Sequence, residues 1–369
     1  EEVYAGHPEE HAAEMAEHFA QSTEREDLEK ALKYGEVAAE QAIGVYAYGE
    51  AARLLAQALQ VQEVLAPDDR ARRCDLLLAL GGALTPAGEP RRVYDTVAPE
   101  AFALAEAMDD CIRLSRTCVI ALDAINRYGA GWRWRSPEFR RWAERADEYS
   151  EPETTDRVSA DDYMHLASLA EDNLTGARAF IIHAIELARR LDDANSLFSA
   201  SFSFLFGIST PPLLEEERWR LVTEMEGRAT VGVTPRTLGK WLFAGAMVSL
   251  DWGERGRAEV LLGDLGRLAQ RSGDADLLFR SLFAPLFSAF LDGRLTEALS
   301  VIERLNAWAD ETGSPGIGRV LALLYGYRPF LHVGRGGRSD SYIVRVRRGA
   351  IPIRATNCGE CPPGTLRPS

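Results

Sequence analysis

The stretch LARRLDDANSLFSA, Leu187–Ala200, returns twice in the chain, in related versions that begin at Leu104 and Leu268. In each copy Leu-Ala is followed by an aspartate six residues after the leucine, and by another leucine four residues later. Leu-Ala is expected to end one amphipathic helix, and the aspartate to accept hydrogen bonds from the free backbone N–H groups that open the next. We therefore predict one helix–helix joint that is built repeatedly. Its caps are Asp110, Asp193 and Asp274, and its first core-facing residues are Leu114, Leu197 and Leu278.

Hydrophobic residues at helical spacing continue on both sides of this joint as far as residue 331. A helix that starts at residues 7–10 and keeps helical spacing through Ala12, Met15, Ala16 and Phe19 is followed by a loop at 21–27. Two helices with alanine-rich contact faces come next, at 28–43 and 46–64. The later first-of-pair helices are expected at 69–84, 111–126, 160–170, 194–207, 235–251, 275–292 and 317–331. The later second-of-pair helices are expected at 91–108, 137–148, 174–191, 214–228, 256–271 and 295–309.

The spacing of these pairs predicts a repeat architecture. Corresponding positions of the second helices are 37 to 45 residues apart, in the range of helical-hairpin solenoids. We therefore expect an all-α fold, a right-handed superhelical α-solenoid. Its organisation would be a junction helix at 1–20, the solenoid at 21–331 and an atypical tail at 332–369.

The bulk composition is that of an ordinary globular protein, with 46% hydrophobic and 27% charged residues. A net charge of −14 argues against direct nucleic-acid binding over the whole chain. Five scattered cysteines form no disulfide framework, and no apolar run reaches the roughly 20 residues of a membrane helix. We expect a cytoplasmic protein without a membrane partner.

The last 38 residues differ from everything before them. They carry seven arginines against two acids, a net charge of +5, which leaves −19 for residues 1–331. Three interpretations of this tail stay open: a β-like start of a new domain, a disordered arginine-rich linker, and out-of-frame translation at a truncated gene end. We favour the last, because the composition changes abruptly within an expected repeat.

A family resemblance enters at Tyr48–Leu59, YGEAARLLAQAL. Small Ala51, large Leu55 and small Ala58 have the spacing of the second helix of a tetratricopeptide repeat. In the preceding helix a small residue, Ala39, stands where the family has one, whereas Gly35 stands where the family favours tryptophan. The later units are longer than the usual repeat, so the chain resembles tetratricopeptide-like regions of large bacterial regulators.

A narrower resemblance covers about the first 90 residues, in the segments HPEEHAAEMAEHFAQS, EKALKYGEVAAEQAIGVYAYGEAARLLAQALQVQEVL and RRCDLLLALGGALTPAGEP. They are similar to the region after the ATPase module of multidomain AAA-type signalling ATPases. The resemblance implies a helical arm between an upstream nucleotide-binding domain and an output domain, either a LuxR-type helix-turn-helix or a nucleotide cyclase.

Three short motifs imitate sites of chemistry. His7–His11 matches an inverted zinc-protease pattern, but Pro8 places His7 at or before the helix start. Gly232–Lys240 resembles a phosphate loop, yet it has six residues between its glycines and a tryptophan after the lysine. Cys358 and Cys361 form a C-x-x-C that lacks a second pair. We therefore expect no metal, no cofactor and no catalytic site.

Aromatic residues supply the candidate partner contacts. Trp132–Arg145, WRWRSPEFRRWAER, has the tryptophans and arginines of binding hot spots, although we favour Phe139 and Trp142 as core residues. Ser199–Phe206 and Ser281–Phe290 are rich in phenylalanine on first-of-pair helices, which line the concave face in tetratricopeptide arrays. Core packing explains them equally well. The candidate contacts are Phe202, Phe204, Phe283, Phe287, Trp132, Trp134 and Arg135.

These observations favour a non-catalytic arm of a larger ATP-dependent signalling or transcription-regulating protein. Its partner would be a protein, a peptide or a small effector in the concave groove. The alternative is a stand-alone peptide-binding scaffold without an ATPase. An enzyme is the least favoured, because six histidines in 369 residues form no acid–base cluster.

Overall fold

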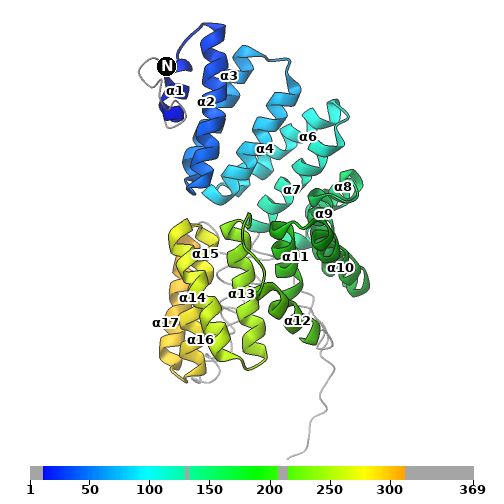
Figure 1. Ribbon diagram of the computed structural model, residues 1–369, viewed down its shortest axis with the longest axis vertical. Helices are drawn as coiled ribbons and strands as arrows, with labels where there is room; N and C mark the ends of the chain where they lie inside the picture. The colour runs from blue at the N-terminus through cyan, green and yellow to red at the C-terminus, as the bar shows by residue number, and fades with distance from the viewer. Residues whose placement is uncertain (1–10, 129–132, 207–214, 312–369) are drawn as a thin grey trace, which may run out of the picture. The chain divides into compact units, whose positions relative to one another are not determined.

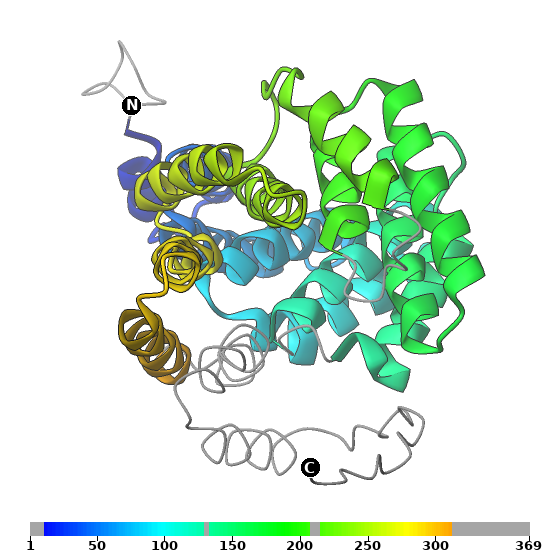
Figure 2. The same cartoon turned by 90° about the horizontal axis from the view of Figure 1, so that it is seen from below.

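The computed structural model describes residues 11–128, 133–206 and 215–311 of the 369-residue chain. In these ranges all regular secondary structure is helical and no strand occurs, so the all-α prediction is confirmed. The chain divides into two compact units, Glu1–Ser288 and Ala289–Ser369. Figures 1 and 2 show the helices of the first unit side by side in chain order.

The first unit opens with helices that pack mainly on their chain neighbours. Their bounds are α1 Ala12–Phe19, α2 Arg25–Gly44, α3 Tyr48–Leu65, α4 Arg70–Ala87, α5 Pro90–Arg92, the π-helical turn Val93–Val97, α6 Ala98–Ala107, α7 Cys111–Tyr128, the 3₁₀ turn Arg133–Arg135 and α8 Pro137–Tyr149.

The same pattern continues from α9 to α15. The bounds are α9 Thr155–Ala170, α10 Leu174–Leu191, α11 Ala194–Phe206, α12 Glu215–Glu226, α13 Pro235–Asp251, α14 Arg255–Ser272, α15 Ala275–Ser281, α16 Phe283–Leu291 and α17 Leu295–Glu311. Alternate helices of the first unit, α7, α9, α11, α13 and α15, also pack on one another in sequence. The helix predicted at 317–331 and the tail boundary at 331 fall outside the described residues.

All three predicted aspartate caps are present. Asp110 accepts a hydrogen bond from the backbone N–H of Arg113 at 3.0 Å, and Asp193 accepts one from Ser196 at 2.7 Å. Asp274 accepts two, from residues 276 and 277, at 2.8 and 3.2 Å. Each carboxylate satisfies N–H groups that have no partner inside their own helix.

The leucine that follows the cap matches the prediction in only two copies of the joint. Leu114 and Leu197 are 3% and 2% exposed. In the third copy Leu277 is fully buried, whereas Leu278 is partly exposed. The prediction for Leu278 is therefore wrong by one residue. Asp274 accepts from the backbone N–H groups of both the second and the third residue after itself.

Two predicted helices are interrupted where a proline occurs. The helix expected at 91–108 contains a π-helical turn just before Pro99, and the one expected at 275–292 breaks at Leu282, three residues before Pro285. Proline has no N–H to donate to the carbonyl four residues earlier, and its ring clashes with that carbonyl. A π turn or a break moves the carbonyl aside.

The alanine-rich faces of α2 and α3 pack closely on each other, as predicted. Ala39, Ala51, Leu55 and Ala58 are each at most 3% exposed. A Cβ atom added at Gly35 would lie 3.7 Å from the Cβ of Ala58. The two backbones therefore approach so closely that this position has room for a small side chain and none for the tryptophan favoured by tetratricopeptide repeats. The loop expected at 21–27 is shorter, because α2 begins at Arg25.

Candidate functional site

The aromatic candidates lie in different surroundings. Phe204 and Phe283 are 8% and 0% exposed and belong to the core, whereas Phe202 and Phe287 are only partly buried. Trp134 packs against the core, and the guanidinium of Arg135 lies over its ring at 4.9 Å. Trp132 falls outside the described residues. Within the same segment the interpretation of Phe139 and Trp142 as core is confirmed, at 0% and 8% exposure.

A continuous row of aromatic rings links α11, α13 and α16. Phe202 stacks on Phe206 at 5.2 Å between ring centroids, and Phe206 contacts Phe243 at 6.0 Å. Phe243 contacts Phe283 at 5.4 Å, which in turn contacts Phe287 at 5.9 Å. The structure therefore joins three of the predicted residues, Phe202, Phe283 and Phe287, through two that the sequence analysis did not single out.

Two cations lie against one end of this row. The ammonium of Lys240 is 5.6 Å from the centroid of Phe202, and the guanidinium of Arg280 is 5.5 Å from the same ring. Arg280 is also 5.7 Å from Phe206 and 5.3 Å from Phe243. Cations over ring faces interact with the negative face of the π system, more strongly when they are shielded from water.

These cations belong to a mixed group of charges that we call the inner cluster. It comes from four alternate helices, with Asp123 and Arg127 of α7, Asp162 and Tyr163 of α9, Arg236 and Lys240 of α13, and Asp276 and Arg280 of α15. Arg236 pairs with Asp123, 113 residues away in sequence, with 3.5 Å between Nη1 and Oδ2. Arg280 pairs with Asp276 of its own helix at 2.9 Å, and Arg127 lies 3.9 Å from the cap Asp274.

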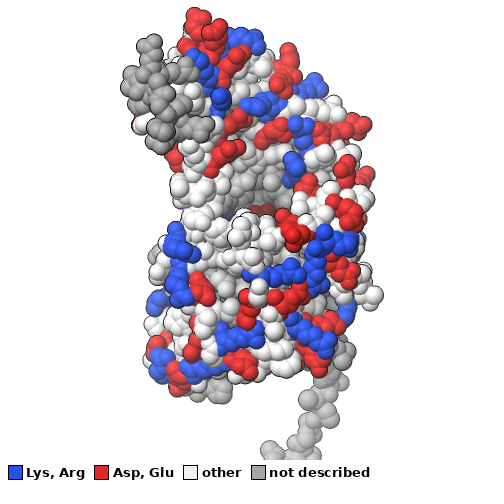
Figure 3. Space-filling view, in the orientation of Figure 1, with Lys and Arg blue, Asp and Glu red and all other residues white. Residues whose placement is uncertain are grey.

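The inner cluster is enclosed by protein. The side chains of Arg280, Arg127 and Arg236 are 10%, 12% and 17% exposed. Asp123 keeps 33% exposure and lines a cavity of about 240 Å³ with Asp162 and Tyr163. On the face shown in Figure 3, acidic and basic side chains are interspersed, and a recess in that face holds acidic side chains.

Several polar atoms of the inner cluster are buried without a hydrogen-bond partner in the described part of the chain. They are Nη1 of Arg127, Nε of Arg236 and Oδ1 of Asp162. Lys240 likewise has no carboxylate within ion-pair distance among the described residues. Buried polar groups in folded proteins are almost always paired. Two donors and one acceptor of the inner cluster therefore have no hydrogen-bond partner among the described residues.

Burial and neighbouring charge move the pKa values of these groups in opposite directions. Burial raises the pKa of Asp162 to about 6, against the opposing effects of a hydrogen bond from Ser203 and of Lys240. Burial also raises the pKa of Asp276, but Arg280, Arg236 and Lys240 together outweigh it and hold that pKa well below its usual range. Burial, reinforced by the charge of Arg236, lowers the pKa of Lys240.

The inner cluster was missed in the sequence, although a signal was present. Three first-of-pair helices carry charged residues four apart within otherwise apolar runs: Asp123 with Arg127, Arg236 with Lys240, and Asp276 with Arg280. Residues four apart share one helix face. An isolated helix would pair such charges within itself, as Arg280 and Asp276 do, whereas Asp123 and Arg236 find each other across helices.

The short motifs acquire no chemistry from the described structure. Thr234 caps α13, and Lys240 lies inside that helix and not in a phosphate-binding loop. His7 and the pair Cys358 and Cys361 lie outside the described residues. Within residues 11–128, 133–206 and 215–311, no three His, Cys, Asp or Glu side chains are grouped as a metal site requires.

No protein-family model matches the chain, and no curated protein matches it significantly. Among the helices described, none is both long enough and apolar enough to cross a membrane. The inner cluster therefore has to be interpreted from its own geometry.

Proposed function

We propose that this chain is a non-catalytic, tetratricopeptide-like arm that binds a protein, a peptide or a small effector on the face formed by its first-of-pair helices. The arm would belong to a larger cytoplasmic protein that transduces signals or regulates transcription in an ATP-dependent manner. The proposal takes the helix pairs to wind into a right-handed superhelix with that face inside. Packing between consecutive helices and between alternate helices supports this view.

One observation carries the proposal: charged and aromatic side chains from α7, α9, α11, α13 and α15 converge with buried polar atoms left unpaired. Lys240 and Arg280 flank the partly exposed ring of Phe202, and Asp162 offers an unpaired oxygen nearby. In many proteins, replacement of a buried group of charges by apolar residues of the same volume stabilises the folded state. Its retention fits a binding role better than a structural one.

The binding proposal is tested by panning a peptide-display library against the chain and measuring the selected peptide by calorimetry. We expect Lys240→Gln and Phe202→Ala each to weaken binding about tenfold or more, since one lost charged or aromatic contact is worth at least ~1.4 kcal/mol. The matched control is Arg220→Gln, an exposed arginine of α12 that pairs with Glu216 one turn away.

A loss of binding indicates direct contact only if Lys240→Gln and Phe202→Ala melt at the same temperature as the native chain. If Phe202→Ala lowers the melting temperature as much as Phe204→Ala, Phe202 is a core residue and the binding face is refuted. The larger assembly is tested separately by reading the coding region upstream of Glu1. A Walker motif there supports the regulator, whereas a start codon just upstream would leave the stand-alone scaffold.

A further inference from the structure

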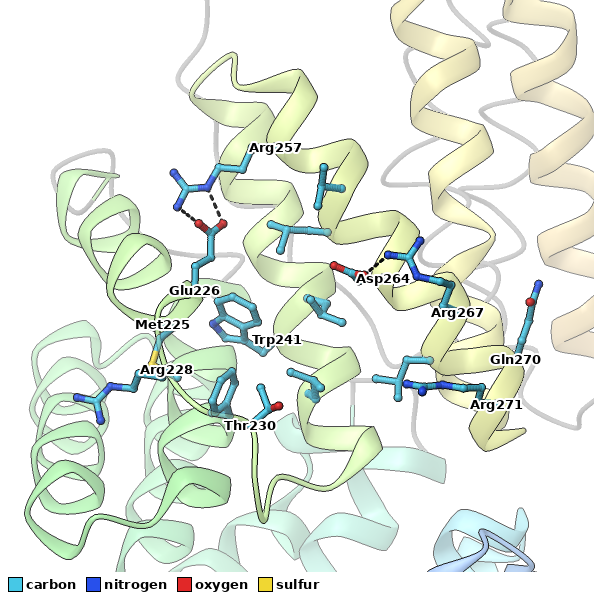
Figure 4. A pocket seen from close by; sticks show the side chains of 16 residues that line it. Met225, Glu226, Arg228, Thr230, Trp241, Arg257, Asp264, Arg267, Gln270 and Arg271 are labelled. Atoms are coloured by element: carbon cyan, nitrogen blue, oxygen red, sulfur yellow. Dashed lines mark hydrogen bonds and ion pairs between the residues drawn. The ribbon is translucent and has the colours of Figure 1, made fainter.

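A second pocket lies away from the inner cluster, between α12, α13 and α14 (Figure 4). The joint between an outer helix and the next inner helix is two residues long between α10 and α11 and between α14 and α15, and three to five residues long at the earlier joints of the first unit. After α12, eight residues, 227–234, separate Glu226 from Pro235. The repeated joint is absent here, and α12 packs only thinly on α11 and α13.

The resulting pocket has a volume of about 810 Å³, within the range of small-molecule sites. Its floor is apolar and comes from all three helices and from α11: Phe198, Met225, Leu238, Trp241, Leu242 and Leu261. Val260, at 62% exposure, adds an uncovered apolar side chain at its edge. Burial of these surfaces by a ligand would be favourable.

The rim of this pocket is basic in a chain whose net charge is −14. Four arginines and two acids line it, and one of the arginines, Arg228, pairs with Glu224 outside the lining at 3.1 Å. Arg257 binds Glu226 at 2.6 Å, and Arg267 pairs with Asp264 (Figure 4). Exposed Arg271, by contrast, has no carboxylate within ion-pair distance among the described residues.

An unpaired donor is also built into the wall. Trp241 is 3% exposed, and its indole Nε1 is buried without an acceptor in the described part of the chain. The nitrogen points to the side of the pocket where Met225 and Glu226 lie (Figure 4). A buried tryptophan N–H ordinarily finds an acceptor.

From the apolar floor and the basic rim with its unpaired Arg271, we infer that this pocket binds a small monocarboxylate with an apolar body. The body covers Trp241 and the leucines, and the carboxylate pairs with Arg271 at the rim. An extended acidic peptide fits less well, because the basic rim encloses an apolar floor. The site is independent of the inner cluster and of the function proposed for it.

The test is calorimetric titration of the full chain with dodecanoate and with dodecan-1-ol. We expect saturable binding of one dodecanoate per chain and roughly tenfold weaker binding of the alcohol, which lacks the charge-assisted hydrogen bond to arginine. Arg271→Gln should remove this preference without affecting binding of dodecan-1-ol. Val260→Trp, at an exposed edge position, should block both ligands. Arg220→Gln should change neither.

Several results would overturn the inference. They are the absence of saturable dodecanoate binding below its micelle concentration, equal affinity for acid and alcohol, and an equal effect of Arg220→Gln. Binding of a hexaglutamate peptide at this rim without binding of dodecanoate would assign the pocket to a protein partner instead. Melting temperatures of Arg271→Gln and Val260→Trp should equal that of the native chain.

Discussion

Neutralisation of Asp162 should stabilise the protein, and by an amount that depends on pH. Asp162 has a buried oxygen without a partner, and burial raises the pKa of its carboxyl from 3.8 to about 6. The folded state therefore favours the protonated acid, and its ionisation destabilises the fold as the pH rises from about 4 to 6. Asp162→Asn removes this ionisation and keeps an oxygen that accepts from Ser203.

The size of the effect follows from the pKa shift. A shift of roughly two units at 1.36 kcal/mol per unit corresponds to about 3 kcal/mol, fully present above pH 6. At pH 4 the folded carboxyl is protonated and the unfolded one is only about half ionised, so the difference falls below about 1 kcal/mol. We therefore expect the free energy of unfolding of Asp162→Asn to exceed that of the native chain by about 3 kcal/mol at pH 7, and to come close to it at pH 4.

Urea unfolding at pH 4, 5.5 and 7 measures this difference directly. Asp172→Asn is the matched control, because Asp172 is exposed immediately after the same helix and its left-handed backbone, with φ 59°, suits asparagine. The reasoning is refuted if Asp162→Asn is less stable than the native chain at pH 7. It is also refuted if the stability difference is the same at pH 4 and pH 7.

Further predictions concern the caps, the core and the thiols. Asp193→Ala should lower the free energy of unfolding by about 1 kcal/mol, as the loss of a helix cap usually does. Asp274→Ala should lower it more, because Asp274 accepts from two N–H groups and faces Arg127. Equal losses for the two variants in urea unfolding would contradict this. Phe198→Ala should lower the free energy of unfolding by about 3–5 kcal/mol, because the ring is 1% exposed. A decrease of less than about 1 kcal/mol would place Phe198 outside the core. Iodoacetamide should alkylate exposed Cys111 and spare Cys118, because burial raises the pKa of the Cys118 thiol to about 12. Mass spectrometry of the labelled native protein measures this, and equal labelling of both cysteines would refute the burial of Cys118.

Local features of this chain could be predicted because the physics behind them is local. An aspartate cap acts on N–H groups two and three residues away, so Asp110, Asp193 and Asp274 were recognisable from spacing alone. The two interrupted helices were also within reach, since Pro99 and Pro285 remove a backbone donor wherever they occur. The error at Leu278 concerns which of two adjacent leucines is buried, and that depends on how the helix packs on its neighbours.

The sequence by itself therefore determined the all-helical class of the chain and the three aspartate caps. The roles of the phenylalanines depended on tertiary structure: Phe202 and Phe204 lie two residues apart on α11, but one faces two cations while the other is core. The pairing of Asp123 with Arg236 across 113 residues likewise exists only in the folded chain. Helix propensity and capping act over a few residues, whereas burial and charge pairing depend on which helices meet in space.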